Sequence, residues 1–362
     1  MKKKRFLIVS NLYPSIKDKT YGTFVENFYN EFCKEFSNDR VDLCVIKGRA
    51  NKICKLWKYI CFYLKLTFYT LLFNYDLIYV HYITLSSIPL KFIQKFKHIN
   101  IAFNIHGDDL LSKSRFAEKE LNFISPLLFS SKLIIVPSFY FRSVFLKKFP
   151  LINVDNIYIS PSGGIKKNFF IRQNKIRQST LVLGYVSRID EGKGWEVFLS
   201  AISKLKEHFK VKGYIAGTGK QVPEMIKHIT QYGLTNIVKY LGPIGHEKLP
   251  SLYALLNLFV FPTQLRESLG LVGLEAMAAS VPVVGSDIGG LKSYIVNGYN
   301  GYLFETGSSQ DLYIKIIQYV NMSDEKKIRM GENAYRTALN YQSDVVSTKL
   351  FDKIRQKYDL KL

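Results

Sequence analysis

The chain has 362 residues, which is more than one ordinary domain needs and suits two domains that each bury a core. Hydrophobic residues make up 47% of the sequence, a composition that excludes an intrinsically disordered chain. The formal net charge of +22 indicates an anionic partner, which could be nucleic acid, a phosphorylated substrate or a membrane surface. Charge alone does not choose among these three.

The cysteines and the N-terminus indicate a reducing, cytoplasmic setting. The four cysteines fall in the first sixth of the chain, without a CxxC pair or a histidine at ligand spacing, so neither a disulfide framework nor a zinc site is expected. The opening MKKKRFLIVSNLYP has a basic tip, but its apolar run FLIV is too short for a signal peptide. We expect a buried first strand there instead.

Short apolar runs alternate with longer helical stretches, which predicts an α/β fold with parallel sheets. The first series of expected strands is Phe6–Ser10, Val41–Ile46, Leu77–His81, Ile101–Ile105, Leu133–Val136 and Ile157–Ile159. The second series is Leu181–Ile189, Gly213–Ala216, Val238–Leu241, Leu258–Phe261 and Val281–Ser286. The polar segment Pro161–Thr180 is the expected linker. We therefore expect two doubly wound, Rossmann-like domains facing across a cleft, with ligands at the carboxyl ends of strands.

Two glutamates, Glu267 and Glu275, stand eight positions apart in ESLGLVGLEAMA. One continuous helix would leave them two turns and about 80° apart, so a loop over 267–270 followed by a helix over Leu271–Ala279 is expected. The glycines and the free N–H groups at such a helix start suit an anion. A ligand with phosphate in its middle and hydroxyls at both ends, such as a nucleotide-sugar, fits this interval.

The segment SRIDEGKG places Arg188 and Lys193 on the loop after the first strand of the second series, between glycines. Two cations beside a helix N-terminus suit a diphosphate, although a solvated surface turn would give the same pattern. The segment AGTGK at 216–220 repeats the pattern but lacks the spacing of a P-loop.

Two strand ends in the first half also carry candidate residues. No GxGxxG follows the first strand, which weighs against a dinucleotide cofactor; instead Gly22 precedes an expected helix at Phe24–Phe36, where its N–H could meet a phosphate. The alternative is a loop glycine without a ligand. In HGDD, His106 could bond a sugar hydroxyl or a developing charge, and Asp108 or Asp109 could orient it or an acceptor hydroxyl. The alternative is an N-cap aspartate beside a structural histidine.

Together these motifs resemble those of the group 1, or family 4, retaining glycosyltransferases, which have the GT-B fold. The resemblance rests on Glu267 and Glu275 with the continuation LEAMAASVPVVGSDIGG, on SRIDEGKG, AGTG and HEKLPSLYALLNLFVFPT, and on the opening SNLYPS…YGTFVENF. These motifs span nearly the whole chain in the order typical of the family. The resemblance implies a hexosyltransferase that uses a nucleotide-sugar donor.

The resemblance also implies a role for each matching residue. Glu275 would hold the ribose hydroxyls of the donor, and Glu267 would contact the hydroxyls of the donor sugar. His106 would lie near the sugar and the reacting centre, and Gly22 would touch the phosphate. No metal or other cofactor is expected, because protein cations and a helix dipole neutralise the leaving diphosphate. The groups that would hold this diphosphate are Arg188, Lys193 and the backbone amides of Ser268, Leu269, Gly270 and Leu271.

In this family, retention of the configuration at the anomeric carbon of the sugar is explained by front-face attack, so Glu267 is not assigned as a nucleophile. The sequence departs from the usual family pattern at Leu269, where an aromatic residue is common, at Ser280, where glycine is common, and near Ser293, where many members have an acid. Residues 1–165, joined by a final helix at about 341–362, would form the acceptor-binding domain, and residues 166–340 the donor-binding domain.

Residues 51–100 are strongly basic, with seven lysines and one acid, Asp76. Within them Asn51–Phe73 is aromatic and lysine-rich, and a helix there could lie on an anionic membrane surface. Lys65 interrupts an apolar run already too short to span a bilayer. The alternative is a helix that simply packs on the sheet with its lysines solvated. The aromatic residues named for this helix are Trp57, Tyr59, Phe62 and Tyr63.

A lipid-linked saccharide acceptor at the inner face of the bacterial cytoplasmic membrane would explain this basic, aromatic stretch. Family analogy then favours assembly of O-antigen, capsule or exopolysaccharide. A soluble sugar or sugar-phosphate acceptor is the alternative. Nucleic acid is not an expected partner, because no helix-turn-helix, RNP or zinc pattern occurs. A scaffold without transferase activity is disfavoured by the presence of both glutamates, Arg188 and Lys193.

Overall fold

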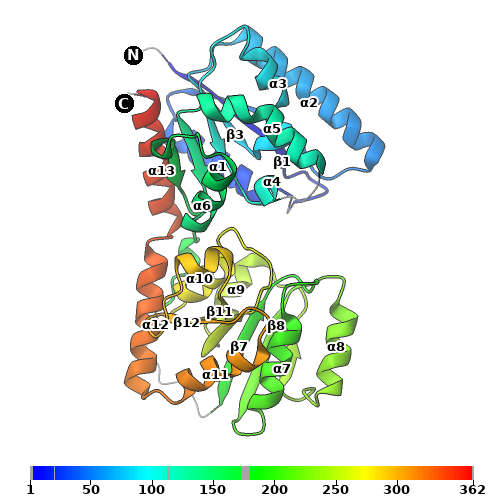
Figure 1. Ribbon diagram of the computed structural model, residues 1–362, viewed down its shortest axis with the longest axis vertical. Coiled ribbons are helices and arrows are strands. Elements are labelled where there is room, and N and C mark those ends of the chain that lie inside the picture. The colour runs from blue at the N-terminus through cyan, green and yellow to red at the C-terminus, as the bar shows by residue number, and fades with distance from the viewer. Residues whose placement is uncertain (1–2, 20, 112–114, 173–179, 361–362) are drawn as a thin grey trace. The chain divides into compact units, whose positions relative to one another are not determined.

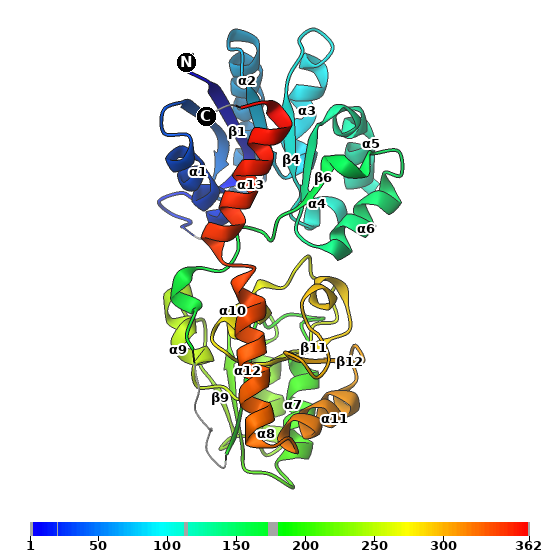
Figure 2. The ribbon, with the colours of Figure 1, turned by 90° about the vertical axis from the view of Figure 1, so that its left-hand side faces the viewer.

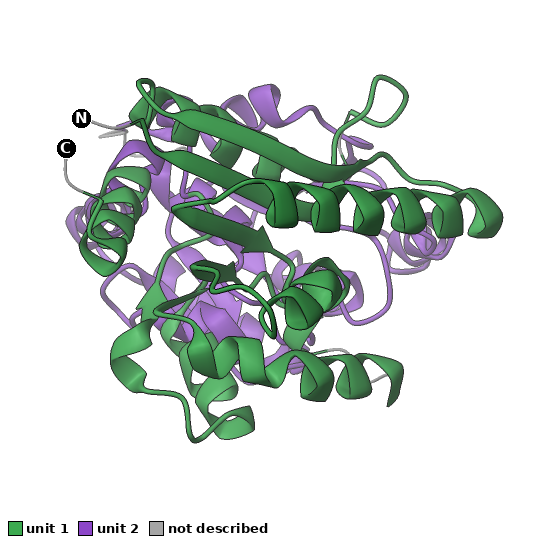
Figure 3. Ribbon diagram, turned by 90° about the horizontal axis from the view of Figure 1, so that it is seen from above, with its two compact units in different colours: residues 1–163, 346–362 green, residues 164–345 purple. Residues whose placement is uncertain are grey.

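The computed structural model describes residues 3–19, 21–111, 115–172 and 180–360. The chain divides into two compact units, shown in different colours in Figure 3. Unit 1 comprises residues 1–163 and 346–362, and unit 2 comprises residues 164–345. Each unit contains its own six-stranded parallel sheet with helices on both faces. The α/β class and the doubly wound character predicted from the sequence are confirmed.

The sheet of unit 1 has the strand order β2-β1-β3-β4-β5-β6. The direction of winding reverses between β1 and β3, and doubly wound sheets bind ligands beyond the carboxyl ends of the strands at such a point. Candidate residues of unit 1 are therefore those that follow β1 and β3. The strands are β1 (Arg5–Tyr13), β2 (Arg40–Lys47), β3 (Leu77–His81), β4 (Ile101–Asn104), β5 (Leu133–Val136) and β6 (Ile157–Ile159).

Helices cover both faces of this sheet, as Figures 1 and 2 show. One face packs against α2 (Lys52–Leu72), α3 (Ile83–Ile93), α5 (Arg115–Ser130) and α6 (Phe139–Lys148). The other packs against α1 (Thr23–Glu35) and the C-terminal α13 (Ser343–Tyr358), whose Phe351 and Ile354 join the same core as Phe6. The C-terminal segment therefore completes the core of the first sheet. The short helices are α4 (Asp108–Leu111) and the 3₁₀ turn η1 (Val154–Asn156).

Helix α2 packs on the sheet through one side only. Phe62 and Leu66 are buried there, and Tyr59 and Tyr63 pack against the same core. The alternative of a helix that packs on the sheet therefore holds for the side of α2 that carries Tyr59, Phe62 and Tyr63. Trp57, by contrast, is 62% exposed. Among the described residues, none of the helices combines the length and hydropathy that crossing a bilayer requires.

The sheet of unit 2 has the strand order β12-β11-β10-β7-β8-β9, and its winding reverses between β7 and β10. One face packs against α7 (Trp195–Leu205), α8 (Val222–Gln231) and α11 (Ser309–Val320). The other packs against α9 (Leu249–Tyr253), α10 (Leu271–Ala278) and α12 (Asp324–Leu339). The strands are β7 (Leu181–Val186), β8 (Val211–Ala216), β9 (Val238–Tyr240), β10 (Leu258–Phe261), β11 (Val283–Ser286) and β12 (Gly301–Phe304), and the 3₁₀ turns are η2 (Lys167–Phe169), η3 (His246–Lys248) and η4 (Gly289–Ser293).

Two sequence-based expectations about unit 2 need correction. Strand β12 was not expected, although it pairs with β11 at the edge of the sheet. The segment expected as a linker is partly core, because Ile165 and Phe169 are buried against α9 and α10. Residues 173–179 of that segment lie outside the described residues.

Candidate functional site

Two loops meet at the point where the winding of unit 2 reverses. The loop after β7 carries Gly192 and Gly194, both with positive φ, and the loop after β10 begins at Pro262. The N–H of Gln264 donates to the carbonyl of Gly192 at 2.7 Å. A Cβ built on Gly194 would lie 1.8 Å from the carbonyl oxygen of Pro262, so only glycine allows the loops to approach this closely.

An ion pair links the side chains of these two loops. Lys193 Nζ lies 2.6 Å from Glu267 Oε1, and the two side chains are 11% and 22% exposed. The hydroxyl of Thr263 also donates to Glu267 Oε1, at 3.2 Å. Behind the pair, the buried Tyr185 hydroxyl lies within hydrogen-bonding distance of the Lys193 carbonyl. The cation and the carboxylate are therefore held in fixed positions, with part of each side chain accessible.

Arg188 occupies the same loop but points elsewhere. Its Nη1 lies 3.3 Å from Asp190 Oδ2, and the arginine side chain is 71% exposed. Asp190 also accepts from the backbone N–H of Lys220, which ties the AGTGK loop to the loop after β7. A Cβ on Gly217 would lie 1.8 Å from the carbonyl oxygen of Ser187. Close loop packing therefore accounts for this AGTG glycine.

The segment after Glu267 is a loop that leads into α10, as the glutamate spacing predicts. Gly270 begins the helix with φ of 82°, and Leu269 is buried in the core of unit 2. The Glu267 carbonyl accepts from the N–H of Gly290 at 2.8 Å, which anchors the loop to η4. Helix geometry leaves the N–H groups at the start of the first turn, those of Leu271 and Val272, without intrahelical acceptors.

Glu275 lies in the second turn of α10 and is only 6% exposed. Its two carboxylate oxygens have different donors: His246 Nε2 lies 2.9 Å from Oε1, and the Tyr253 hydroxyl lies 3.1 Å from Oε2. An ionised carboxylate can only accept, so His246 carries a proton on Nε2. Burial, aided by the charge of Glu275, raises the pKa of Tyr253 well above its ordinary value and keeps it a donor.

In unit 1, Gly22 lies at the N-terminus of α1, beside the end of β1. Its φ is 74°, and a Cβ there would lie 2.7 Å from the backbone of Leu12 and Tyr13. Glycine is therefore required for the backbone geometry, whether or not its N–H meets a ligand.

His106 follows β4 and pairs with a second histidine at the end of β3. His106 Nε2 lies 3.0 Å from His81 Nδ1, and the His106 ring contacts those of Phe24 and Tyr82. Burial lowers the pKa of His106 to about 3 and the pKa of His81 well below its ordinary value, so both rings are neutral at pH 7.

The environment of His81 indicates which atom holds the shared proton. His81 is 1% exposed, and its Nε2 has no hydrogen-bond partner. An unpaired buried acceptor is tolerated better than an unpaired buried N–H, so the proton belongs on His81 Nδ1, which donates to His106 Nε2. His106 then carries its own proton on Nδ1 and acts there as a donor.

The structure describes the side chain of only one of the two aspartates in the HGDD segment. Asp109 is 4% exposed and accepts from the backbone N–H groups of His106, Gly107 and Ile83. Burial raises its pKa to about 6, against the effect of these amides. Asp109 therefore organises the backbone around His106 from a position inside α4, and not as the N-cap of that helix. The side chain of Asp108, the candidate for acceptor binding, lies outside the described residues.

Sequence reasoning assigned no role to Thr263, His246, Tyr253 or His81. The first three lie in the segment HEKLPSLYALLNLFVFPT, and the fourth ends an expected strand. The position of His81 and Thr263 at or just after strand ends was an available signal, whereas no local pattern singled out His246 or Tyr253. Within the described residues no cluster of three or more histidine, cysteine, aspartate or glutamate side chains is arranged to hold a metal ion.

Comparison with known proteins identifies the domain to which this site belongs. Residues 166–337 match the family model described as "Glycosyl transferases group 1". The chain carries a group 1 glycosyl transferase domain. The matched residues include the loops after β7 and β10 and the whole of α10. This match confirms that the motifs belong to a group 1 glycosyl transferase domain.

The chain also aligns with curated relatives. A D-inositol 3-phosphate glycosyltransferase of Corynebacterium urealyticum is 29% identical over 185 residues, which are 49% of this chain and 43% of that protein. An uncharacterized glycosyltransferase of Methanocaldococcus jannaschii is 26% identical over 258 residues, 71% of this chain and 69% of that protein. The first of these alignments thus spans less than half of the relative.

The fold of the whole chain is that of GT-B glycosyltransferases. Anabaena Alr3699/HepE, solved in complex with UDP-glucose, has a TM-score of 0.73 at 21% identity, with 98% of this chain and 100% of that chain covered. The predicted GT-B fold is confirmed by this likeness.

Proposed function

We propose that the protein is a family 4, retaining glycosyltransferase that moves a sugar from a nucleotide-sugar to a saccharide acceptor. The observation that carries this proposal is the arrangement around the E-x7-E motif. A fixed cation and carboxylate, Lys193 and Glu267, stand at one end of a loop and helix start, and a clamped carboxylate, Glu275, stands at the other. This sequence of groups matches that of a nucleotide-sugar: sugar, diphosphate and ribose.

Each group has a proposed part in donor binding. Glu275 accepts hydrogen bonds from the ribose hydroxyls through lone pairs that His246 and Tyr253 leave available. Glu267 contacts the hydroxyls of the donor sugar. Lys193 and the first-turn N–H groups stabilise the negative charge of the diphosphate as it leaves. The remaining diphosphate contacts are Arg188, which would exchange its exposed pair with Asp190 for the ligand, and the amides of Ser268, Leu269, Gly270 and Leu271.

Unit 1 is proposed to supply the acceptor-binding residues and part of the reacting centre. Gly22 would contact the donor phosphate and Asp108 the acceptor. His106 would donate from Nδ1 to the sugar or to the charge that develops during transfer, since its low pKa excludes an imidazolium. In the proposed front-face reaction the leaving phosphate oxygen accepts the acceptor's proton. The reaction then needs neither an enzymic nucleophile nor a metal.

For the acceptor we propose a lipid-linked saccharide in bacterial surface polysaccharide assembly, with the protein at the inner face of the cytoplasmic membrane. The basic stretch over residues 51–100 supports this choice, because anionic lipid surrounds such acceptors. A soluble sugar phosphate is the second candidate. It is favoured by the name of the corynebacterial relative, a D-inositol 3-phosphate glycosyltransferase.

A donor screen tests the proposal. Thermal shift against UDP-, GDP-, ADP- and dTDP-sugars should identify one nucleotide that stabilises the protein, and labelled sugar from that donor should be transferred to acceptor. Glu275→Ala and Lys193→Ala should each abolish the shift. Normal donor affinity in both variants would contradict the site. Transfer to a membrane extract but not to water-soluble sugar phosphates would select the lipid-linked acceptor, and the reverse would select the soluble one.

A further inference from the structure

Helix α2 presents a second apolar face, opposite the one that packs on the sheet. Phe62, Leu66 and Thr70 define its buried side. At 100° per residue, the exposed apolar residues gather around the opposite side and recur every three or four positions along the helix. They are Ile53, Leu56, Trp57, Ile60, Leu64, Phe68 and Leu71, with exposures between 38% and 74%. We call these residues the outer stripe of α2.

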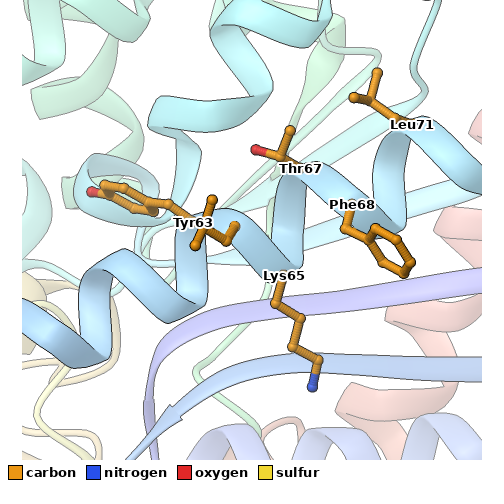
Figure 4. Close-up of a pocket in the computed structure, with 6 residues that line it drawn as sticks. Tyr63, Lys65, Thr67, Phe68 and Leu71 are labelled. Carbon is orange, nitrogen blue, oxygen red and sulfur yellow. The ribbon is translucent and has the colours of Figure 1, made fainter.

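The outer stripe is a continuous apolar surface, whereas most exposed apolar residues of soluble proteins stand singly. A helix of this length extends about 30 Å, and the stripe runs along nearly all of it. In the C-terminal half of α2 the surface is hollowed beside the stripe (Figure 4). The hollow is lined by Tyr63, Leu64, Lys65, Thr67, Phe68 and Leu71. Contiguous apolar surface of this kind marks a contact with another apolar surface.

The charges around the stripe indicate what that surface is. No aspartate or glutamate occurs between Asp42 and Asp76, while Lys52 and Lys55 are exposed at the start of α2. Lys58 and Lys65 instead turn toward the protein, where their Nζ atoms donate to carbonyls of Gly48 and Leu43. These lysines keep the helix on the edge strand β2 and still add positive charge beside the stripe.

We infer that the outer stripe of α2 is a docking surface for an anionic lipid bilayer. The helix lies in the plane of the interface, its apolar side chains enter the boundary between headgroups and acyl chains, and its lysines attract anionic headgroups. A second copy of the chain is a poorer occupant. Pairing α2 with α2 would set lysines against lysines with no carboxylate on either helix. The inference rests on the membrane location given under the proposed function but not on the transferase reaction, so its test needs no donor and its failure would leave the donor site untouched.

Tryptophan fluorescence can report binding of the outer stripe to vesicles. The chain has two tryptophans, of which Trp57 is 62% exposed and Trp195 is fully buried, so only Trp57 should respond. On mixing with phosphatidylglycerol vesicles, the fluorescence should shift to the blue, and Trp57→Phe should abolish the shift. The protein should float with these vesicles in a density gradient. It should float at least ten-fold less with pure phosphatidylcholine or in high salt.

Substitutions test whether the outer stripe of α2 is the surface that binds the vesicles. Leu64→Gln with Phe68→Gln should reduce flotation by at least ten-fold. Leu151→Gln, at an equally apolar residue that is 85% exposed and distant in the chain, should leave it unchanged. Circular dichroism should show both variants folded, and Leu64→Gln alone provides a milder variant. Absence of flotation by the wild type, or a dimer in sedimentation that the double substitution dissociates, would overturn the inference.

Discussion

Lys193 Nζ and Glu267 Oε1 lie 2.6 Å apart although their residues follow different strands, β7 and β10. This ion pair joins the two loops at the point where the winding of unit 2 reverses. The paired side chains are only partly exposed, so each holds the other in a fixed orientation in the absence of donor. A bound nucleotide-sugar would meet a preformed pair of opposite charges.

The proposed division of labour between these two residues predicts different kinetic effects. Lys193→Ala should lower both nucleoside diphosphate affinity and kcat/KM by about 100-fold, because the cation acts on the phosphate in both states. Glu267→Gln should lower kcat/KM by a similar factor but change the nucleoside diphosphate affinity by less than about three-fold. Calorimetric titration and initial rates measure the two quantities.

Lys204→Ala is the matched control, because this partly exposed lysine of unit 2 bonds only to Gln310 within the described residues. It should retain the wild-type affinity and rate. Equal loss of nucleotide affinity in the Lys193 and Glu267 variants would show that the pair acts as a structural unit, and the separate roles would be wrong.

The clamp on Glu275 makes a second prediction. Tyr253→Phe leaves one oxygen of a buried carboxylate without its donor, which should cost about 1 to 3 kcal/mol of stability and weaken nucleotide binding several-fold. His246→Gln keeps an N–H donor and should restore more binding than His246→Ala. Tyr299→Phe, at an exposed tyrosine of the same unit, serves as control. Unchanged nucleotide affinity in Tyr253→Phe would rule out a positioning role for the tyrosine.

The neutral histidine pair of unit 1 predicts a pH dependence of stability. The folded pKa of His106 is about 3, below the ordinary unfolded value of about 6.5. The unfolded chain therefore binds more protons between these values, so stability is present above about pH 6.5 and is lost as pH falls, by at most about 1.4 kcal/mol per pH unit for each histidine. Thermal unfolding between pH 5 and 7 measures the slope.

His81→Phe should reduce this slope, because the phenyl ring fits among Phe28 and Tyr79 and binds no proton. His98→Gln removes an exposed histidine of the same unit and should leave the slope unchanged. If both variants kept the wild-type slope, other groups would be responsible for the acid sensitivity.

Sequence patterns predicted every strand of the two sheets except β12. β12 is only four residues long and begins with Gly301, whose φ is 157° and whose Cβ would lie 1.9 Å from the Val283 carbonyl oxygen. A glycine at a strand start signals a turn in the sequence, but here it allows close approach to β11. Short edge strands of this kind are defined by their neighbour, which a local pattern does not contain.

The candidate site of unit 2 also contains contacts that a local sequence pattern does not predict. The loop and helix around Glu275 follow from local spacing, whereas its partners His246 and Tyr253 lie 29 and 22 positions away, and their contact depends on packing of α9 against α10. Ser280 illustrates a departure that the structure explains: its φ of 60° is the left-handed geometry that makes glycine common after a helix. Its hydroxyl bonds to the Ile171 carbonyl. For the absence of an acid at Ser293, the structure offers no explanation.

The contact between the two loops of unit 2 makes the last prediction. Gly194→Ala combines a positive φ with a Cβ 1.8 Å from the Pro262 carbonyl oxygen, so the loops must separate. Gly298→Ala is its control, because it has a similar φ of 75° but nothing within 4 Å of the added Cβ. The control should lose about 1 kcal/mol of stability from backbone strain alone. Gly194→Ala should lose at least about 2 kcal/mol more and bind nucleotide poorly, because Lys193 moves away from Glu267. Equal stability losses in the two variants, measured by thermal unfolding, would contradict the role assigned to this contact.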